Sequence, residues 1–113
     1  MYWDVCKCGQ LPEPLDFLVF DAAVNCGTGG AGLQLQRALN AIGGKLEEDG
    51  VIGPLTLDNV AAAWAVNIWR VVAAVEMQRV EWYSTIINRD KSQLVFISGW
   101  LKRTIRNARV AGI

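Results

Sequence analysis

The chain has 113 residues, a formal net charge of zero and 52% apolar residues, which suits one small domain with a real core. It contains no histidine, which excludes Ser–His–Asp and Cys–His catalysis, and its three cysteines argue against a closed disulfide framework. The longest uncharged stretch, residues 22–36, contains four glycines, so we predict no membrane span.

Charge is unevenly distributed along the chain. All 11 acidic residues lie within residues 1–90, whereas residues 91–113 carry five basic residues and no acid. This basic segment is either a solvated helix face or a patch that contacts acidic polymers. Because the net charge is zero and no helix-turn-helix or zinc spacing is present, we predict no nucleic-acid partner. Cys-x-Cys is also poor zinc spacing, so we predict reduced thiols and neither metal nor cofactor.

Residues 1–14 look like an abrupt start to the domain. Tyr2 and Trp3 are large and apolar, and Pro12 and Pro14 make the approach to the first long helix stiff and non-helical. We interpret residues 1–14 as a junction or the remnant of a preceding catalytic half. Residues 15–113 are then a single helical domain.

Two helices are expected next. Residues 15–26 are apolar nearly all round, which predicts a central, buried helix that ends at Gly27. Asp21 and Asn25 lie four residues apart on one face of it, so burial requires both to be hydrogen-bonded. Residues 31–42 carry an apolar stripe at helical spacing and stop at a pair of glycines.

The stretch from Asp49 to Thr56 is the densest cluster of residues with special backbone preferences. Gly50 and Gly53 can adopt positive φ, and Asp49 can accept hydrogen bonds from nearby backbone N–H groups. Pro54 suits the first turn of a helix. We predict a tight loop, with Val51 and Ile52 pointing inward, that launches the next helix. Its structural residues are Asp49, Gly50, Gly53, Pro54 and Thr56.

The remaining chain is expected to be helical. A helix from Pro54 passes Trp64 and bends near residues 65–67 into a long helix that reaches residue 88. Shorter helices are predicted over residues 92–97 and 100–110. No segment has the alternation of a strand flanked by hairpin turns, so we predict an all-α fold, a compact bundle of about five helices.

Four motifs in order give the chain a family resemblance. The octapeptide Phe20–Gly27, the segment from Leu35 to Thr56 and the Gly99–Arg103 stretch resemble elements of glycoside hydrolase family 108, whose members are lysozyme-like. Tyr2-Trp3 followed by Leu11-Pro12 resembles the junction after that family's first half. The middle segment resembles the family's predicted peptidoglycan-binding domain. The resemblance implies a lysozyme-like, peptidoglycan-binding-like fold, action at the bacterial cell wall or periplasm, and a phage or bacterial source.

The sequence departs from that family at one decisive point. The family's acid catalyst is a Glu in a Glu-Gly-Gly motif, and this sequence contains no Glu-Gly-Gly. We therefore expect this chain to be the peptidoglycan-binding or glycan-cleft half of an N-acetylmuramidase-type hydrolase, without a catalytic residue of its own. We predict a glycan-facing set of Asp21, Asn25, Tyr83, Trp100 and Arg103. All but Tyr83 lie in the motifs that carry the resemblance, and Tyr83 is added as an aromatic residue of the long helix that could stack on a sugar ring.

Several alternatives stay open. Asp21 is either a glycan-cleft group or a structural carboxylate that ties its helix to basic C-terminal elements such as Arg103. Glu76, Arg79 and Tyr83 form either an internal network or the floor of a groove. The chain as a whole could instead be a helical interaction module that docks another chain, or forms a homodimer, through its N-terminal aromatic residues.

Overall fold

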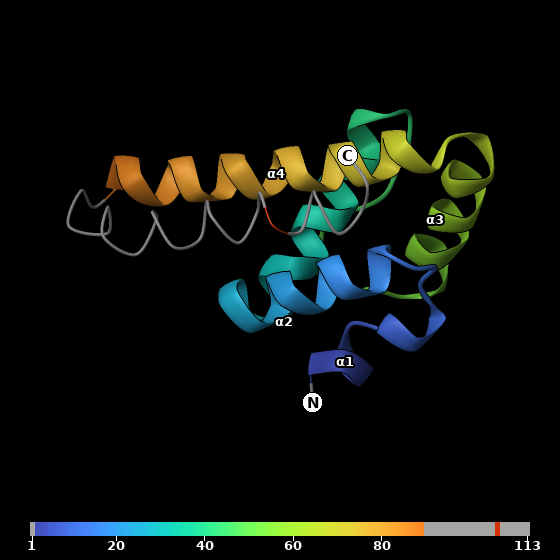
Figure 1. Ribbon diagram of the computed structural model, residues 1–113, viewed down its shortest axis with the longest axis horizontal. Helices are drawn as coiled ribbons and strands as arrows, with labels where there is room; N and C mark the ends of the chain where they lie inside the picture. Colours follow the sequence, from blue (N-terminus) through green and yellow to red (C-terminus); the bar gives the residue numbers. More distant parts are fainter. Residues whose placement is uncertain (1, 90–105, 107–113) are drawn as a thin grey trace.

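The structure, a computed structural model, describes residues 2–89 and Arg106, and this part of the chain is helical and has no strand (Figure 1). The elements in order are α1 (Tyr2–Val5), the 3-10 helix η1 (Cys8–Gln10), α2 (Leu15–Ala41), α3 (Pro54–Val66) and α4 (Ile68–Arg89). The predicted all-α, compact bundle is confirmed. The helices predicted over 92–97 and 100–110 lie outside the described residues.

Helix α2 consists of two halves that meet at Gly27. This glycine has φ 80° and ψ 163°, a conformation that L-residues with a Cβ avoid, and the two halves run in different directions (Figure 1). The predicted break at Gly27 is therefore confirmed. The second half begins directly after Gly27, whereas the sequence predicted a start at residue 31. Gly30 lies in this early part of the second half, and a Cβ there would come within 3.2 Å of the Trp82 ring, so a glycine fits this close contact best.

The core lies where α2, α3 and α4 meet, and α4 packs mainly against α2. Small and branched apolar side chains from both halves of α2 fill it, which lets the helices approach closely. Its fully buried members on these helices are Leu15, Val19, Ala23, Ala31, Leu35, Ala38, Leu39, Val60 and Val71. The first half of α2 is less enclosed than predicted, because Phe17 and Val24, seven residues apart on one face, are exposed.

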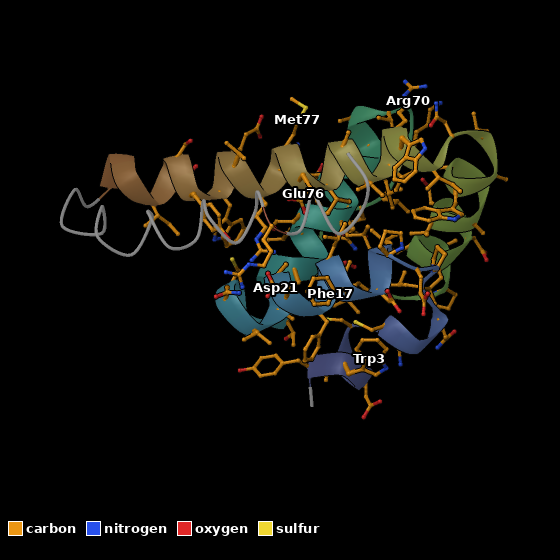
Figure 2. All side chains as sticks on the ribbon, viewed as in Figure 1. Trp3, Phe17, Asp21, Arg70, Glu76 and Met77 are labelled. Carbon is orange, nitrogen blue, oxygen red and sulfur yellow. The ribbon has the colours of Figure 1, made fainter. Side chains whose placement is uncertain are left out.

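The N-terminal residues fold back onto the first half of α2. Cys6 and Cys8 are buried in the same core, and the Trp3 ring meets the Phe20 ring edge-on, with 5.6 Å between centroids. Figure 2 shows Trp3 below this half of α2. All three cysteines are free, and burial raises the pKa of the Cys8 thiol to about 11. These are protonated, structural thiols, as predicted.

Helices α3 and α4 are separated by one extended residue, Asn67. Its side-chain oxygen accepts a hydrogen bond from the backbone N–H of Arg70 at 3.2 Å, which caps the start of α4. The bend predicted near residues 65–67 is thereby confirmed, as is the start of α3 at Pro54. None of the helices within residues 2–89 is both long and apolar enough to cross a bilayer.

Candidate functional site

The loop between α2 and α3 is organised by one buried side chain, Gln36. Its Nε2 donates to the Asp49 carboxylate at 3.0 Å and to the Val51 carbonyl at 2.9 Å, with a longer contact of 3.3 Å to the Thr56 hydroxyl. Its Oε1 accepts from the Gly50 N–H at 2.8 Å. A carboxamide nitrogen has two N–H donors, so Gln36 uses both of them, and one acceptor site of its oxygen, to hold the loop and the first turn of α3.

Asp49 closes the turn from the other side, as predicted. Its Oδ1 accepts from the Val51 N–H at 2.9 Å as well as from Gln36. These two hydrogen bonds, that of Gln36 first, lower the pKa of the Asp49 carboxyl. Asp49 therefore stays ionised and carries a fixed negative charge at the surface of the loop.

The two loop glycines turn out to be different. Gly50 has φ 77°, so the prediction of positive φ holds there. Gly53 has φ −111° and ψ −170°, an extended conformation open to any residue, so the positive φ that glycine allows is not used there. The prediction that Val51 and Ile52 both point inward is correct only for Ile52, which is buried. The Val51 side chain is exposed, because the carbonyl and N–H of this residue face Gln36 and Asp49.

The loop lies unusually close to α2. A Cβ on Gly32 would overlap the carbonyl oxygen of Gly50, so only glycine allows this contact. Two further side chains of α2 hold the earlier part of the loop. Asn40 bonds both the N–H and the carbonyl of Leu46, and Arg37 pairs with Glu48 at 3.3 Å. The loop is thus fastened to α2 along its length.

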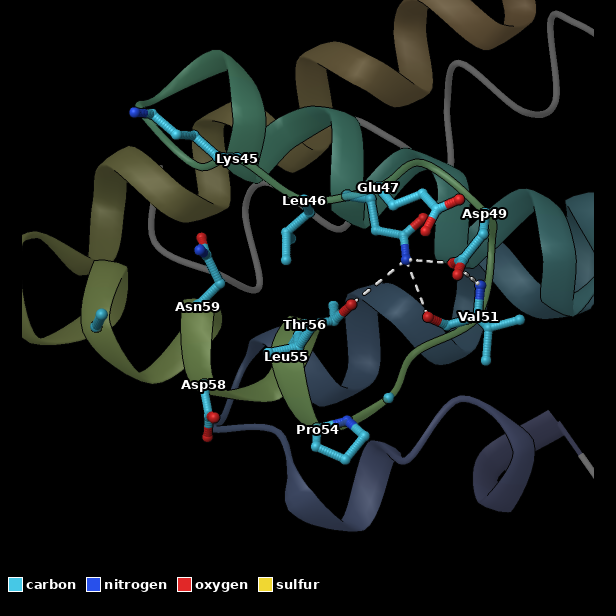
Figure 3. Close-up of a pocket in the computed structure, with 13 residues that line it drawn as sticks. Lys45, Leu46, Glu47, Asp49, Val51, Pro54, Leu55, Thr56, Asp58 and Asn59 are labelled. Atoms are coloured by element: carbon cyan, nitrogen blue, oxygen red, sulfur yellow. Dashed lines mark hydrogen bonds between the residues drawn. The ribbon is translucent and has the colours of Figure 1, made fainter.

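A cavity of about 490 Å³ opens between this loop and the first turns of α3 (Figure 3). We call it the loop cavity. The loop from residue 44 to 48 has no regular secondary structure. Lys45, Glu47 and Asp49 line the cavity, while Glu48 turns back to Arg37. The other described lining residues are Gln36, Leu46, Val51, Gly53, Pro54, Leu55, Thr56, Asp58, Asn59 and Ala62.

A second polar group of residues, Asp21, Glu76, Arg79 and Tyr83, lies between α2 and α4. We call it the buried cluster. An Arg79 guanidinium nitrogen is 2.7 Å from Asp21 Oδ2, and Arg79 Nε donates to the Tyr83 hydroxyl at 2.7 Å. Arg79 and Tyr83 are each 1% exposed. The carboxylate of Asp21 thus ties α2 to α4 through Arg79. The predicted tie to Arg103 falls outside the described residues and stays a prediction.

Glu76 is the unusual member of the buried cluster. It is 7% exposed, and neither carboxylate oxygen has a hydrogen-bond partner within the described part of the chain. Burial raises its pKa to about 7, an effect that Arg79 opposes and Asp21 reinforces. Figure 2 shows Glu76 on the side of α4 that faces α2. Its oxygens are closed to a ligand.

The predicted site residues therefore separate into three groups. Asp21 and Tyr83 belong to the buried cluster, and Asn25 donates to the Asp21 carbonyl at 2.8 Å beside it. Trp100 and Arg103 lie outside the described residues. The residues predicted as a structural loop line the loop cavity, with the exception of Gly50.

Sequence reasoning missed two contributors. Gln36 was seen only as part of a motif, and Gly32 was not singled out. The glycines at positions 29, 30 and 32 were the available signal, since glycine allows another backbone to approach closely, and Gly32 is the one that meets the Gly50 backbone. No group of three or more potential metal-ligating side chains occurs among residues 2–89 and Arg106.

Comparison with known proteins bears directly on the loop cavity. A family described as "Predicted Peptidoglycan domain" matches residues 31–105, which contain every described residue that lines the cavity. The chain belongs to this family. The family "Glycosyl hydrolase 108" matches residues 1–27 and ends at the Gly27 kink, so the resemblance seen in the sequence is confirmed. These matches support peptidoglycan as the partner of this predicted peptidoglycan domain.

The fold is also found in a solved structure. The structure of Brucella abortus SagA matches with a TM-score of 0.77 and 26% sequence identity, over 97% of this chain and 56% of the SagA chain. This chain thus spans little more than half the length of SagA. No curated protein matches the chain.

Proposed function

We propose that this chain is the peptidoglycan-binding half of a lysozyme-like cell-wall hydrolase, and that it contacts peptidoglycan through the loop cavity. One observation carries the proposal: the segment that matches the peptidoglycan family contains the whole described lining of the loop cavity. The matched segment, residues 31–105, contains Gln36, the loop it organises and the start of α3. The rigid fastening of the loop to α2 supports the same conclusion, because a preformed wall lowers the entropic cost of binding.

Binding without cleavage is the second part of the proposal. Glycoside hydrolysis needs a carboxyl group with a raised pKa that touches the scissile oxygen. Glu76 has such a pKa, but both its oxygens are buried, and Asp21 is paired with Arg79. Neither the described carboxylates nor the sequence, which has no Glu-Gly-Gly, supplies the family's acid.

The experiment that tests the proposal is co-sedimentation with purified peptidoglycan sacculi. Ala61 and Ala62 are neighbouring, exposed residues on α3, but only Ala62 lines the loop cavity. Ala62→Trp should fill part of the cavity and lower the bound fraction at least several-fold, whereas Ala61→Trp should bind like the parent chain. Equal binding by both variants, or no binding by the parent chain, would overturn the proposal.

A second candidate function is a helical interaction module that docks a second copy or another chain. The observation in its favour is the exposure of Tyr2, Trp3 and Val5 on α1. A stable dimer that weakens on Trp3→Ala, together with no binding to sacculi, would favour it. The prediction that nucleic acid is no partner stays a prediction, tested by salt-sensitive binding to DNA.

A further inference from the structure

The loop cavity differs in chemistry from a sugar-binding site. Carbohydrate sites place a flat aromatic ring against the apolar face of a pyranose, yet none of the described residues lining this cavity is aromatic. Its apolar wall comes from small and branched side chains, including Leu46, Pro54 and Leu55. Such a wall suits methyl groups and short aliphatic chains better than the face of a sugar ring.

The charges around the cavity are mixed. Lys45 supplies a cation, whereas Glu47, Asp49 and Asp58 supply carboxylates (Figure 3). Asp49 is committed to Gln36 and the Val51 N–H, which leaves Glu47 and Asp58, both exposed, to meet a ligand cation. A ligand that carries an ammonium group and a carboxylate on a short chain would satisfy both signs.

The cavity also offers groups that recognise amides. Asn59 presents a carboxamide from α3, which can both donate to and accept from a peptide bond. A cavity of about 490 Å³ is large enough for a few residues of extended peptide. A cavity with small apolar walls, charges of both signs and a carboxamide is complementary to a short peptide.

We propose that the loop cavity binds the stem peptide of peptidoglycan rather than its glycan strand. Glu47 and Asp58 receive an ammonium group, Lys45 receives a carboxylate, and the wall of Leu46, Pro54 and Leu55 takes the small apolar side chains. This inference rests on the proposed function and adds the part of the polymer that is recognised.

The test compares three ligands for the intact chain: whole sacculi, glycan strands stripped of their peptides by an amidase, and soluble stem peptides. We expect retention on sacculi, competition by soluble stem peptide, and at least tenfold weaker binding to the stripped strands. Equal binding to sacculi and stripped strands without competition would overturn the peptide assignment and leave the proposed function intact. Failure to bind sacculi would overturn both.

Matched variants place the recognition in the cavity. Asp58→Asn and Lys45→Gln alter exposed side chains that take part in neither ion pair described above, and each should weaken stem-peptide binding by about 5- to 10-fold. Glu13→Gln and Lys7→Gln remove the same kinds of charge from exposed positions outside the cavity and should leave binding unchanged. Equal losses in both pairs, with unchanged melting temperatures, would show a general charge effect and overturn the assignment.

Discussion

At the scale of single residues, the loop between α2 and α3 contains two glycines, Gly50 and Gly53, whose structural roles differ. Gly50 has φ 77°, and a Cβ on it would lie 3.0 Å from the carbonyl oxygen of Gly29. Gly53 is extended, and a Cβ on it would meet open space. The glycine at position 50 is therefore required by backbone conformation and by a close approach, and the glycine at position 53 by neither.

This difference gives a stability prediction with an internal control. Gly50→Ala should lower the free energy of unfolding by about 1–2 kcal/mol for the left-handed backbone, and further for the crowding at Gly29. Gly53→Ala should change it by no more than about 0.5 kcal/mol. Urea denaturation of the two variants beside the parent chain measures both values. Equal losses in the two variants would contradict the conformational argument.

Only part of this loop could be predicted from sequence. The Asp-Gly-x-x-Gly-Pro pattern predicts a turn followed by a helix, because Asp, Gly and Pro have local backbone preferences that act within a few residues. Gln36 is different. Its four contacts join it to residues 13 to 20 positions away, so its role follows from the tertiary approach of the loop to α2. A local sequence pattern cannot predict contacts between residues so far apart in the chain.

At the scale of elements, the α2–α4 interface is mostly apolar but contains the buried cluster. Helical spacing was enough to predict α4 and to place Glu76, Arg79 and Tyr83 on neighbouring turns of it. It could not decide between an internal network and a groove floor, because that choice depends on which face of α4 meets α2. All three residues are buried, and Arg79 donates to Tyr83, which favours the internal network, although Glu76 has no hydrogen-bond partner among the described residues.

The buried carboxyl of Glu76 makes stability depend on pH. Its pKa is raised from 4.5 to about 7, so well below pH 4.5 the group is protonated in both the folded and unfolded states and makes no pH-dependent contribution to stability. As pH rises toward 7, the unfolded chain releases this proton more readily, and folding stability falls. Above pH 7 the full penalty, on the order of 2–3 kcal/mol, is present.

Glu76→Gln should therefore stabilise the chain at neutral and alkaline pH. We expect a higher melting temperature than that of the parent chain at pH 8, with a difference that shrinks steadily toward pH 4.5. Measuring the difference between the two proteins removes the contribution of all other titrating groups. Asp21→Asn is the comparison within the same cluster, and it should destabilise because it leaves Arg79 buried without its carboxylate. If Glu76→Gln were less stable than the parent chain at pH 8, the argument from the raised pKa of Glu76 would be contradicted.

At the scale of the whole molecule, the chain is a helical body in which the α2 kink separates two family matches. The glycosyl hydrolase 108 match ends at Gly27, and the peptidoglycan domain match begins at residue 31. Composition and periodicity predicted the all-helical fold, and ordered motifs predicted the family. The position of the loop cavity could not be read from either, since it depends on how the loop is held against α2 and α3.

The last prediction concerns catalysis by the chain as it stands. An inverting or retaining hydrolase needs two carboxyl groups that reach opposite sides of one glycosidic bond. Here Glu76 is enclosed, Asp21 is held by Arg79, and the hydrogen bonds to Asp49 favour its ionised form, which cannot donate a proton. We therefore expect no release of reducing ends from sacculi at any pH between 4 and 8, even where binding is saturated. A reducing-end assay beside co-sedimentation separates the two activities in one preparation. Release that disappears on Asp21→Asn or Glu76→Gln would identify that residue as the acid and would show that the interface between α2 and α4 opens to admit a glycan.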